Sequence, residues 1–226
     1  MKHKTEMKEH PILFSVQMVR AILDGTKTQT RRPIPVLPKQ NQSIHHVAKD
    51  KYCFATDHAN GYVSGMSEYF RKPYEVGDYL WVRETYRPVF GQTGDLISVD
   101  YKADPPEKWE RLGDVVGTPV KWRPSIHMPR SASRLTLAIT DIRAEPLPDI
   151  SDEDAIREGI YRSVEIVEPC ESKYPISTDW DGYEAMLSPG VARCDFARMW
   201  RSIYPSGPKS WDAAPWVWAI DFEVVK

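Results

Sequence analysis

Residues 77–84, GDYLWVRE, give the clearest strand signal in the chain. A Gly-Asp pair is typical of a turn, and the run that follows it is rich in the aromatic and aliphatic residues that favour strands. Outward from this stretch, alternation of apolar and polar side chains predicts further strands. We expect four strands to lie in one barrel-like sheet, at 79–84, 96–101, 134–143 and 216–225.

Three stretches have the apolar spacing of an amphipathic helix, at 12–23, 151–158 and 194–204. Ser15 is the expected N-cap of the first helix, and Gly25 follows its end. Because helices and strands do not alternate regularly, a doubly wound parallel sheet is disfavoured. The expected fold class is α+β, a mixed or antiparallel β-barrel with short helices at its ends.

The remaining stretches show weak periodicity and are expected to be surface insertions rather than core, at about 36–73, 87–118 and 161–193. Residues 1–10 are polar and are expected to form a frayed leader. We therefore expect a single domain over 11–226 that carries these insertions.

The charge balance limits the classes of partner. The 226 residues include 30 Lys and Arg and 32 Asp and Glu, which gives a net charge of −2. A histone-like or tail-driven nucleic-acid binder is thereby excluded, whereas a local basic groove is not. Hydrophobic residues at 41% and charged residues at 27% are typical of a globular chain.

The cysteines and the N-terminus bear on location. Cys53, Cys170 and Cys194 are odd in number and form no CxxC motif, so neither a disulfide framework nor a zinc site is expected. No apolar stretch approaches the ~20 residues of a membrane helix, and the N-terminus lacks a signal-peptide core. We expect a soluble cytoplasmic protein without a metal, a cofactor or a membrane partner.

The densest polar motif is KTQTRR at 27–32. Its three cations follow the end of a helix, where they would complement the helix dipole on a solvated turn. A functional role instead requires Lys27 and Thr30 to converge, which a turn permits and an extended strand does not. The sequence leaves both interpretations open.

A second cationic stretch, KWRPSIHMPR at 121–130, is stiffened by two prolines. It places arginines and a histidine beside a tryptophan, a combination that suits a nucleobase and its phosphate. A purely structural loop is the alternative. The candidate substrate or nucleic-acid-binding residues are Arg31, Arg32, Trp81, Arg83, Glu84, Trp122, Arg123, Ser125, His127 and Arg130.

Glu158 is expected in the last turn of a short helix, just before Gly159. A carboxylate there opposes the helix dipole, so the residue is a candidate for function, with chance surface variation as the alternative. The sequence contains no P-loop, GxGxxG, HExxH or GxSxG motif.

Two of these motifs together resemble a known family. ILDGTKTQTRR at 22–32, followed by VGDYLWV at 76–82, resembles the ASCH domain, named for homology to the activating signal cointegrator. Residues 122–133 and 149–159 resemble its larger, phage-associated branch. The resemblance covers about half of the chain, at 12–34, 74–86, 119–160 and 194–225.

The resemblance implies a PUA-like barrel and a catalytic set. Compact bacterial members are amidohydrolases that remove the acetyl group of N4-acetylcytidine, and some relatives are reported as ribonucleases. The catalytic lysine and threonine fall on Lys27 and Thr30, and the glutamate falls on Glu158. In this scheme Thr30 attacks the acetyl carbonyl, Lys27 accepts its proton and Glu158 protonates the leaving amine.

Three hypotheses remain open on the sequence alone. The first is an amidohydrolase acting on a modified pyrimidine nucleoside. The second is an RNA-binding module or ribonuclease that uses the same cationic cleft. The third is a phage protein that acts on a host partner and keeps a vestigial site. The sequence does not indicate an oligomeric state.

Overall fold

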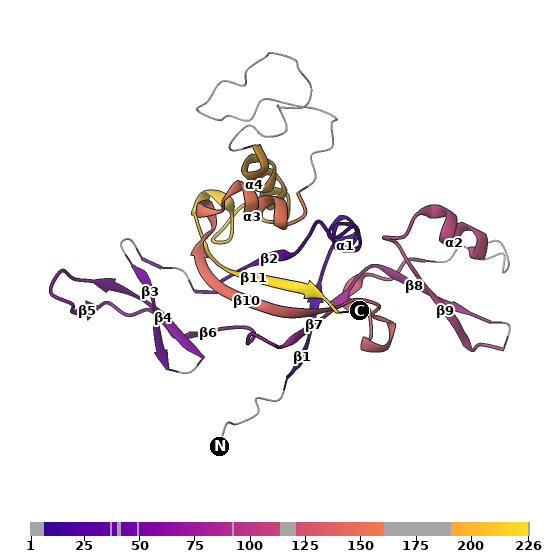
Figure 1. Ribbon diagram of the computed structural model, residues 1–226, viewed down its shortest axis with the longest axis horizontal. Helices are drawn as coiled ribbons and strands as arrows, with labels where there is room; N and C mark the ends of the chain where they lie inside the picture. Colours follow the sequence, from indigo (N-terminus) through magenta and orange to yellow (C-terminus); the bar gives the residue numbers. More distant parts are fainter. Residues whose placement is uncertain are drawn as a thin grey trace, which may run out of the picture. The chain divides into compact units, whose positions relative to one another are not determined.

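The structure is a computed structural model that describes residues 7–36, 38–39, 42–48, 50–91, 93–113, 121–160 and 191–225. The chain divides into two compact units. Unit 1 comprises Met1–Lys27, Val76–Thr140 and Phe222–Lys226, and unit 2 comprises Thr28–Glu75 and Asp141–Asp221. Two long strands, β10 (Thr136–Pro146) and β11 (Trp216–Val224), contribute residues to both units (Figure 1).

Unit 1 is built on a parallel pair of strands. β1 (Glu9–Leu13) runs parallel to β7 (Tyr79–Arg83), and β7 pairs antiparallel with β10. The remaining helices and strands of this unit are α1 (Val16–Leu23), β8 (Tyr86–Phe90), β9 (Leu96–Tyr101), α2 (Pro106–Gly113), and the 3-10 helices η1 (Ser125–His127) and η2 (Arg130–Ala132).

Unit 2 places helices against one face of a strand pair. β2 (Gln29–Pro33) pairs antiparallel with β11, and a separate sheet contains β3 (Ser43–Ala48), β4 (Lys51–Asp57), β5 (Val63–Ser64) and β6 (Phe70–Arg71). The helical segments are η3 (Leu147–Asp149), α3 (Asp152–Arg157), α4 (Val191–Ile203) and η5 (Trp211–Ala213). Figure 1 shows α3 beside α4, whose residues are in contact.

Each unit has its own apolar cluster. In unit 1, Tyr86 packs with Met128 and Ala132, which anchors the loop that follows residue 120. In unit 2, a larger cluster joins α3, α4 and β11, and it contains Leu147, Ile150, Ala155, Phe196, Trp200 and Val217. The larger cluster fixes the helices that carry the charged residues described below.

The mixed α+β character expected from the sequence is confirmed. All three predicted helices form, with the first starting at Val16 rather than at residue 12 and capped by Ser15 as predicted. Three of the predicted strands form at 79–83, 136–146 and 216–224 and share a sheet whose order is β1-β7-β10-β11-β2.

The predicted single barrel-like sheet is wrong in one respect and unconfirmed in another. The strand at 96–101 forms at the predicted residues, but it pairs only with β8 in a two-stranded sheet. The alternation of apolar and polar residues at 96–101 predicted a strand, but it does not indicate which strand pairs with it. Among the described residues the five-stranded sheet has β1 and β2 as its edges, and no closed barrel is found.

Several stretches without strand signals nevertheless form strands. β1 begins in the last two residues of the expected leader and continues into the start of the expected first helix, and it gains its partner from β7, far along the chain. The stretch 36–73 contributes β3 to β6, and Cys53, Phe54 and Phe70 are buried, so the expectation of a surface excursion is wrong there. The expected insertion at 87–118 contains most of β8 together with β9 and α2. Of the expected insertion at 161–193, residues 161–190 lie outside the described residues.

The cysteines differ in their bonding state. Cys53 is a buried free thiol, whereas Cys194 is disulfide-bonded, although the number and spacing of the cysteines predicted no disulfide framework. In the part of the chain that the structure describes, the helices are too short or too polar to cross a membrane.

Candidate polar site on strand β2

The motif at 27–32 begins with a tight turn and ends in a strand. Gly25 ends α1 with a φ of 74°, a backbone conformation that glycine adopts without strain. The backbone N–H groups of Thr26 and Lys27 then both donate to the carbonyl of Ala21 at 2.9 Å. From Gln29 the chain is extended as β2, so the solvated-turn interpretation does not hold for this motif.

Lys27 is buried, with 1% of its surface exposed, and its ammonium lies 5.6 Å from the ring centre of Phe14. Lysine is almost never fully buried unless it is paired. The burial of Lys27 therefore separates it from an ordinary surface cation at a helix end. It is the last residue of unit 1, three residues before Thr30.

Strand alternation divides the side chains of β2 between two faces. Gln29 and Arg31 lie on one face, where Gln29 is registered with Asp221. Thr30 and Arg32 lie on the other, where Arg32 is registered with Trp218. The two faces carry different polar clusters.

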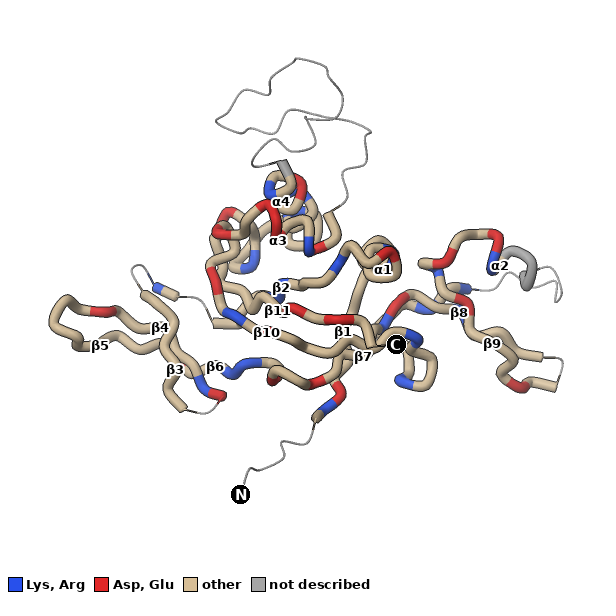
Figure 2. The backbone as a smooth tube through the Cα atoms, in the orientation of Figure 1, with Lys and Arg blue, Asp and Glu red and all other residues tan. Residues whose placement is uncertain are grey.

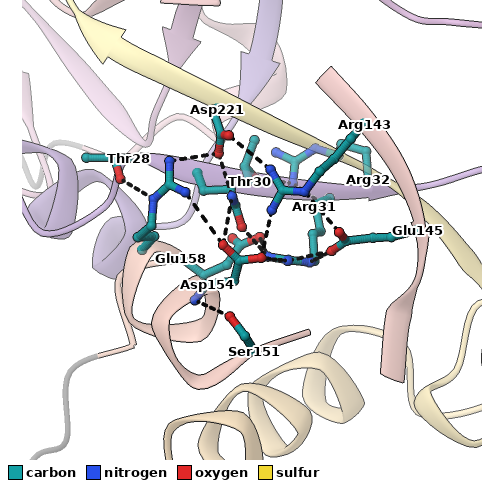
Figure 3. A network of polar contacts seen from close by, with 12 residues as sticks. Thr28, Thr30, Arg31, Arg32, Arg143, Glu145, Ser151, Asp154, Glu158 and Asp221 are labelled. Atoms are coloured by element: carbon teal, nitrogen blue, oxygen red, sulfur yellow. Dashed lines mark hydrogen bonds and ion pairs between the residues drawn. The ribbon is translucent and has the colours of Figure 1, made fainter. Parts of the chain in front are cut away.

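The first cluster surrounds Arg31, whose side chain is fully buried. Its Nε donates to Glu145 Oε1 at 2.9 Å, Nη2 donates to Asp154 Oδ2 at 2.9 Å, and Nη1 donates to Glu158 Oε1 at 3.2 Å (Figure 3). Nη1 also donates to Gln29 Oε1. Arg31 is thus occupied by protein carboxylates rather than presented to a ligand.

Two further arginines extend this cluster. Arg143 donates to Glu145 at 3.0 Å, to Asp154 at 2.7 Å and to Asp221 at 3.0 Å. The resulting network combines three arginines with four carboxylates: Arg31, Arg143, Arg157, Glu145, Asp154, Glu158 and Asp221. Figure 2 shows residues of both signs on β10 and α3. Desolvation opposes ionisation of Asp154, but Arg143 and Arg31 outweigh it and lower the pKa of that carboxyl.

Glu158 is the C-cap of α3, as its position before Gly159 predicted. It is only 3% exposed, so chance surface variation does not describe it. Its backbone N–H donates to Asp154 O at 2.9 Å, which fixes the residue on the helix end. A guanidinium can only donate, so Glu158 Oε1 is the acceptor in the contact with Arg31.

The second cluster surrounds Arg32. Its Nη1 donates to Thr30 Oγ1 at 3.0 Å, and Thr30 is fully buried. Desolvation lowers the pKa of Arg32, and the charge of Glu158 opposes that shift, as do Tyr74 and Tyr204. Thr30 is thus held by Arg32, whereas Glu158 is hydrogen-bonded to Arg31 on the opposite face of β2.

Trp218 belongs to the same face and was not singled out by the sequence. It is 4% exposed, and its indole N–H finds no hydrogen-bond partner among the described residues. Its ring is edge-on to Tyr52, with centroids 5.2 Å apart. An unsatisfied buried donor costs about 1–3 kcal/mol. The Trp-x-Trp spacing at 216–218 predicts that both rings lie on one face of a strand, but it does not predict that the indole N–H of Trp218 is unpaired.

In unit 1, Glu84 forms a separate buried pair. It is 1% exposed and accepts two hydrogen bonds from Arg134, at 2.9 and 3.0 Å. Arg134 also donates to Asp104 at 2.6 Å and lies 4.0 Å from the ring centre of Tyr101. Desolvation raises the pKa of Glu84 more than Arg134 lowers it. Glu84 was among the candidate residues predicted from the sequence, whereas Arg134 and Asp104 were not.

The loop after residue 120 is anchored to Tyr86 by backbone hydrogen bonds, and its cations are exposed. Arg123 exchanges backbone hydrogen bonds with Tyr86 at 2.8 and 3.2 Å, and Met128 is buried. Lys121, Arg123 and His127 are exposed, and Ser125 is half-buried. The side chain of Trp122 lies 5.4 Å from Trp109 and beneath Arg87, so its ring is partly occupied within the protein.

Arginines also surround Trp81 in unit 1. The guanidinium carbons of Arg83 and Arg130 lie 5.4 and 5.9 Å from its ring centre. Arg130 is held by Glu9 at 2.8 and 3.1 Å, and Arg83 Nη2 donates to the carbonyl of Ile126. Of the sequence-predicted binding residues of unit 1, Trp81, Arg83 and Arg130 thus lie together, whereas Glu84 is buried with Arg134.

Unit 1 also contains a pocket of about 520 Å³ that the sequence did not predict. Its charged lining residues are Arg20, Asp24, Asp104, Lys108 and Arg134. Within the described residues, no group of three or more His, Cys, Asp and Glu side chains is arranged to hold a metal ion.

Comparison with known proteins gives no family for this chain: no family model matches it, and neither a curated protein nor a solved structure matches it.

Proposed function

We propose that the protein is an amidohydrolase acting on an acylated pyrimidine nucleoside such as N4-acetylcytidine. The proposal combines the ASCH resemblance with one structural observation. Thr30 Oγ1 accepts a hydrogen bond from Arg32, and Glu158 is ion-paired with Arg31, the residue between them on β2. Two of the three residues that the resemblance assigns to catalysis are therefore buried side chains held by neighbouring arginines of β2.

The proposed chemistry divides amide hydrolysis into two steps. Thr30 Oγ1 bonds to the acetyl carbon while its proton passes to the Lys27 amine, and the carbon–nitrogen bond breaks as Glu158 protonates the departing amine. Water then cleaves the resulting ester, which releases acetate and restores the threonine. A lysine accepts a proton only in its neutral form, which burial favours. Lys27 is buried, in agreement with that requirement.

The same resemblance leads us to assign the fold to the PUA-like class. The mixed sheet with helices at its ends agrees with this assignment, although the five-stranded sheet has open edges among the described residues.

The decisive experiment measures release of acetate from N4-acetylcytidine. Removal of a general acid or base costs about 10²–10⁴-fold in rate, so Lys27→Ala and Glu158→Gln are expected to lose at least about a hundredfold. Thr30→Val, which keeps the side-chain shape and removes the hydroxyl, is expected to lose all turnover. Thr26→Ala is the matched control, because its hydroxyl only donates to the carbonyl of Ala21.

An inactive wild-type protein would contradict the proposed substrate. Activity in Lys27→Ala comparable to wild type would contradict the proposed mechanism, provided that circular dichroism shows all variants folded.

A second candidate function, RNA binding or RNA cleavage, is favoured by one feature of unit 1. Lys121, Arg123 and His127 are exposed on the loop that backbone hydrogen bonds anchor to Tyr86. If they contact phosphates of single-stranded RNA, the logarithm of the binding constant falls with log salt by about 0.7 per contact. Arg123→Ala would then reduce the slope by about 0.7. Binding that is absent at low salt, or independent of salt, would exclude this candidate.

A further inference from the structure

The pocket of unit 1 contains none of the three residues that the resemblance assigns to catalysis. Its volume of about 520 Å³ is within the range of about 300–1,000 Å³ that small-molecule sites occupy. Its lining comes from the end of α1, from residues 103–106 and 108 around the start of α2, and from Arg134. The segment around α2 lies within 87–118, which the ASCH resemblance does not cover, so the pocket is not part of the shared motif.

Arg134 contributes a wall to this pocket rather than a free donor. Its Nε and Nη2 donate to Glu84 at 2.9 and 3.0 Å, and its Nη1 donates to Asp104 at 2.6 Å. Its guanidinium carbon lies 4.0 Å from the ring centre of Tyr101, so one face of the plane is covered. The side chain is still 22% exposed. A guanidinium plane that is open on one side is a surface on which a nucleobase can stack.

Two cations of the lining, Arg20 and Lys108, keep donors that no described residue occupies. Arg20 Nε donates to the carbonyl of Ala103 at 2.9 Å, which holds the arginine against the segment before α2. The two Nη atoms of Arg20 and the ammonium of Lys108 have no partner among the described residues. Because these donors come from α1 and α2 and line one pocket, they suit an anion with several acceptor oxygens, such as a phosphate monoester.

Asp24 restricts the kind of anion that the pocket accepts. It lies one helical turn after Arg20, at the end of α1, and both residues line the pocket. In the part of the chain that the structure describes, its exposed carboxylate has no partner, and an ionised carboxylate only accepts hydrogen bonds. Asp24 would repel a bare anion, so the ligand must carry hydroxyl groups next to its anionic group. Vicinal ribose hydroxyls, which carboxylates bind in dinucleotide sites, meet this requirement.

We propose that this pocket binds a nucleoside monophosphate. Arg20 and Lys108 donate to its phosphate, and Asp24 accepts hydrogen bonds from the ribose hydroxyls. The base lies against Arg134 and the apolar part of the lining, which consists of Leu23, Ala103, Pro105 and Pro106. The inference goes beyond the proposed function and does not depend on it.

The lining also predicts that the pocket does not distinguish between bases. Of its charged side chains, Asp104 and Arg134 bind each other, and the other three are assigned to the phosphate and the ribose. The base therefore meets only stacking and apolar contacts, which tolerate any base. We expect purine and pyrimidine monophosphates to bind with the same affinity.

The first test compares ligands on the full chain by isothermal titration calorimetry. Adenosine 5′-monophosphate (AMP) is expected to show saturable binding, and uridine 5′-monophosphate is expected to bind as tightly. Adenosine, ribose 5-phosphate and 2′-deoxyadenosine 5′-monophosphate each lack one of the proposed contacts. Each of these three is expected to bind about tenfold more weakly than AMP.

The second test compares variants. Lys108→Ala is expected to weaken AMP binding about tenfold, whereas Lys102→Ala, the matched control, leaves it unchanged. Lys102 is likewise an exposed lysine of unit 1, but it does not line the pocket. Asp24→Ala is expected to bind AMP and its 2′-deoxy form with equal affinity, because the group that distinguishes them has been removed.

Several outcomes would overturn the inference. Inorganic phosphate that binds as tightly as AMP would show a pair of cations without a nucleotide site. The absence of AMP binding, or binding of an RNA oligonucleotide without binding of AMP, would also overturn it. So would a loss of AMP binding in Thr30→Val that Lys108→Ala does not share. Weakened AMP binding in Lys108→Ala supports the pocket whether or not the wild type releases acetate, so the pocket and the proposed function fail separately.

Discussion

Two carboxylates, Glu84 in unit 1 and Asp154 in unit 2, are held by arginine in different ways. Glu84 in unit 1 receives both its hydrogen bonds from Arg134, and desolvation raises its pKa. In unit 2, Arg31 is shared by three carboxylates, and Asp154 next to it has a lowered pKa because Arg143 and Arg31 together outweigh desolvation. Glu84 is the more deeply buried of the two and faces one arginine, whereas Asp154 is partly exposed and faces two, so burial and facing charge together give the opposite directions of the two pKa shifts.

The arginines differ as well. The side chain of Arg134 is 22% exposed, whereas that of Arg31 is fully buried. A buried ion pair is weak evidence of net stability, yet removal of one partner leaves the other charge uncompensated. The two arginines thus offer a direct way to test the contrast between the units.

The largest expected effect is that of Arg31→Met. This change leaves three carboxylates without the cation that they share, and the free energy of unfolding is expected to fall by about 3–5 kcal/mol. Arg134→Met is expected to cost less, because Glu84, with its raised pKa, can take up a proton. Urea denaturation at pH 7 measures both. A larger loss in Arg134→Met would contradict the contrast.

The next effect is the pH dependence of stability, which is expected to have opposite signs for Glu84 and Asp154. The folded-state pKa of Glu84 lies above 4.5, so its contribution to stability falls as the pH rises from 4.5 through that pKa. The folded-state pKa of Asp154 lies below 3.8, so its contribution is present above pH 3.8 and is lost as the pH falls through the folded pKa.

Unfolding free energies of the wild type, Glu84→Gln and Asp154→Asn between pH 3 and 7 test this difference. The stability advantage of wild type over Glu84→Gln is expected to shrink with rising pH, and that over Asp154→Asn to grow up to about pH 4. Curves with the same sign would show that the two carboxylates do not differ as described.

A smaller effect compares the N-caps of two helices. Ser15 accepts from the N–H of Met18 at 3.3 Å in unit 1, and Ser151 accepts from that of Asp154 at 3.1 Å in unit 2. Each serine-to-alanine change is expected to cost about 1 kcal/mol in thermal unfolding. Ser151→Ala is expected to cost more, since it also loosens Asp154 within the ion network. Equal costs would show that the network does not depend on the cap.

The smallest effect concerns exposed ion pairs. Arg130 with Glu9 in unit 1 and Arg201 with Asp212 in unit 2 are both largely solvated. Double-mutant cycles are expected to give small coupling energies in each unit, which decrease as the salt concentration rises. A coupling as large as the loss in Arg31→Met would contradict the view that burial distinguishes the network.

Local signals predicted the elements whose causes are local. Ser15 and Gly25 bracket α1, and the alternation of β11 predicted that strand almost to the residue. The motif at 29–33 has no such signal, because β2 is extended through its pairing with β11. Likewise β1 depends on β7, and the sheet to which β9 belongs depends on β8.

The candidate site was predicted to a similar extent. Thr30 and Glu158 were identified from motif and helix position, and both are buried, Thr30 against Arg32 and Glu158 against Arg31. Arg143, Glu145 and Asp221 were not identified, because charged residues that alternate along a strand indicate a solvated face. Their partners come from other elements, with Arg31 of β2 paired to Glu145, Gln29 of β2 bonded to Asp221, and Asp154 of α3 paired to Arg143.

The position of β2 at the border of its sheet has a consequence for solubility. An edge strand exposes hydrogen-bonding groups to which another chain can add, and inward-pointing charges and proline are the features that oppose such addition. β2 contains both, in Arg31 and Pro33, and it is an edge of the described sheet. Arg31, which orders the polar network, therefore also opposes edge-to-edge association between molecules.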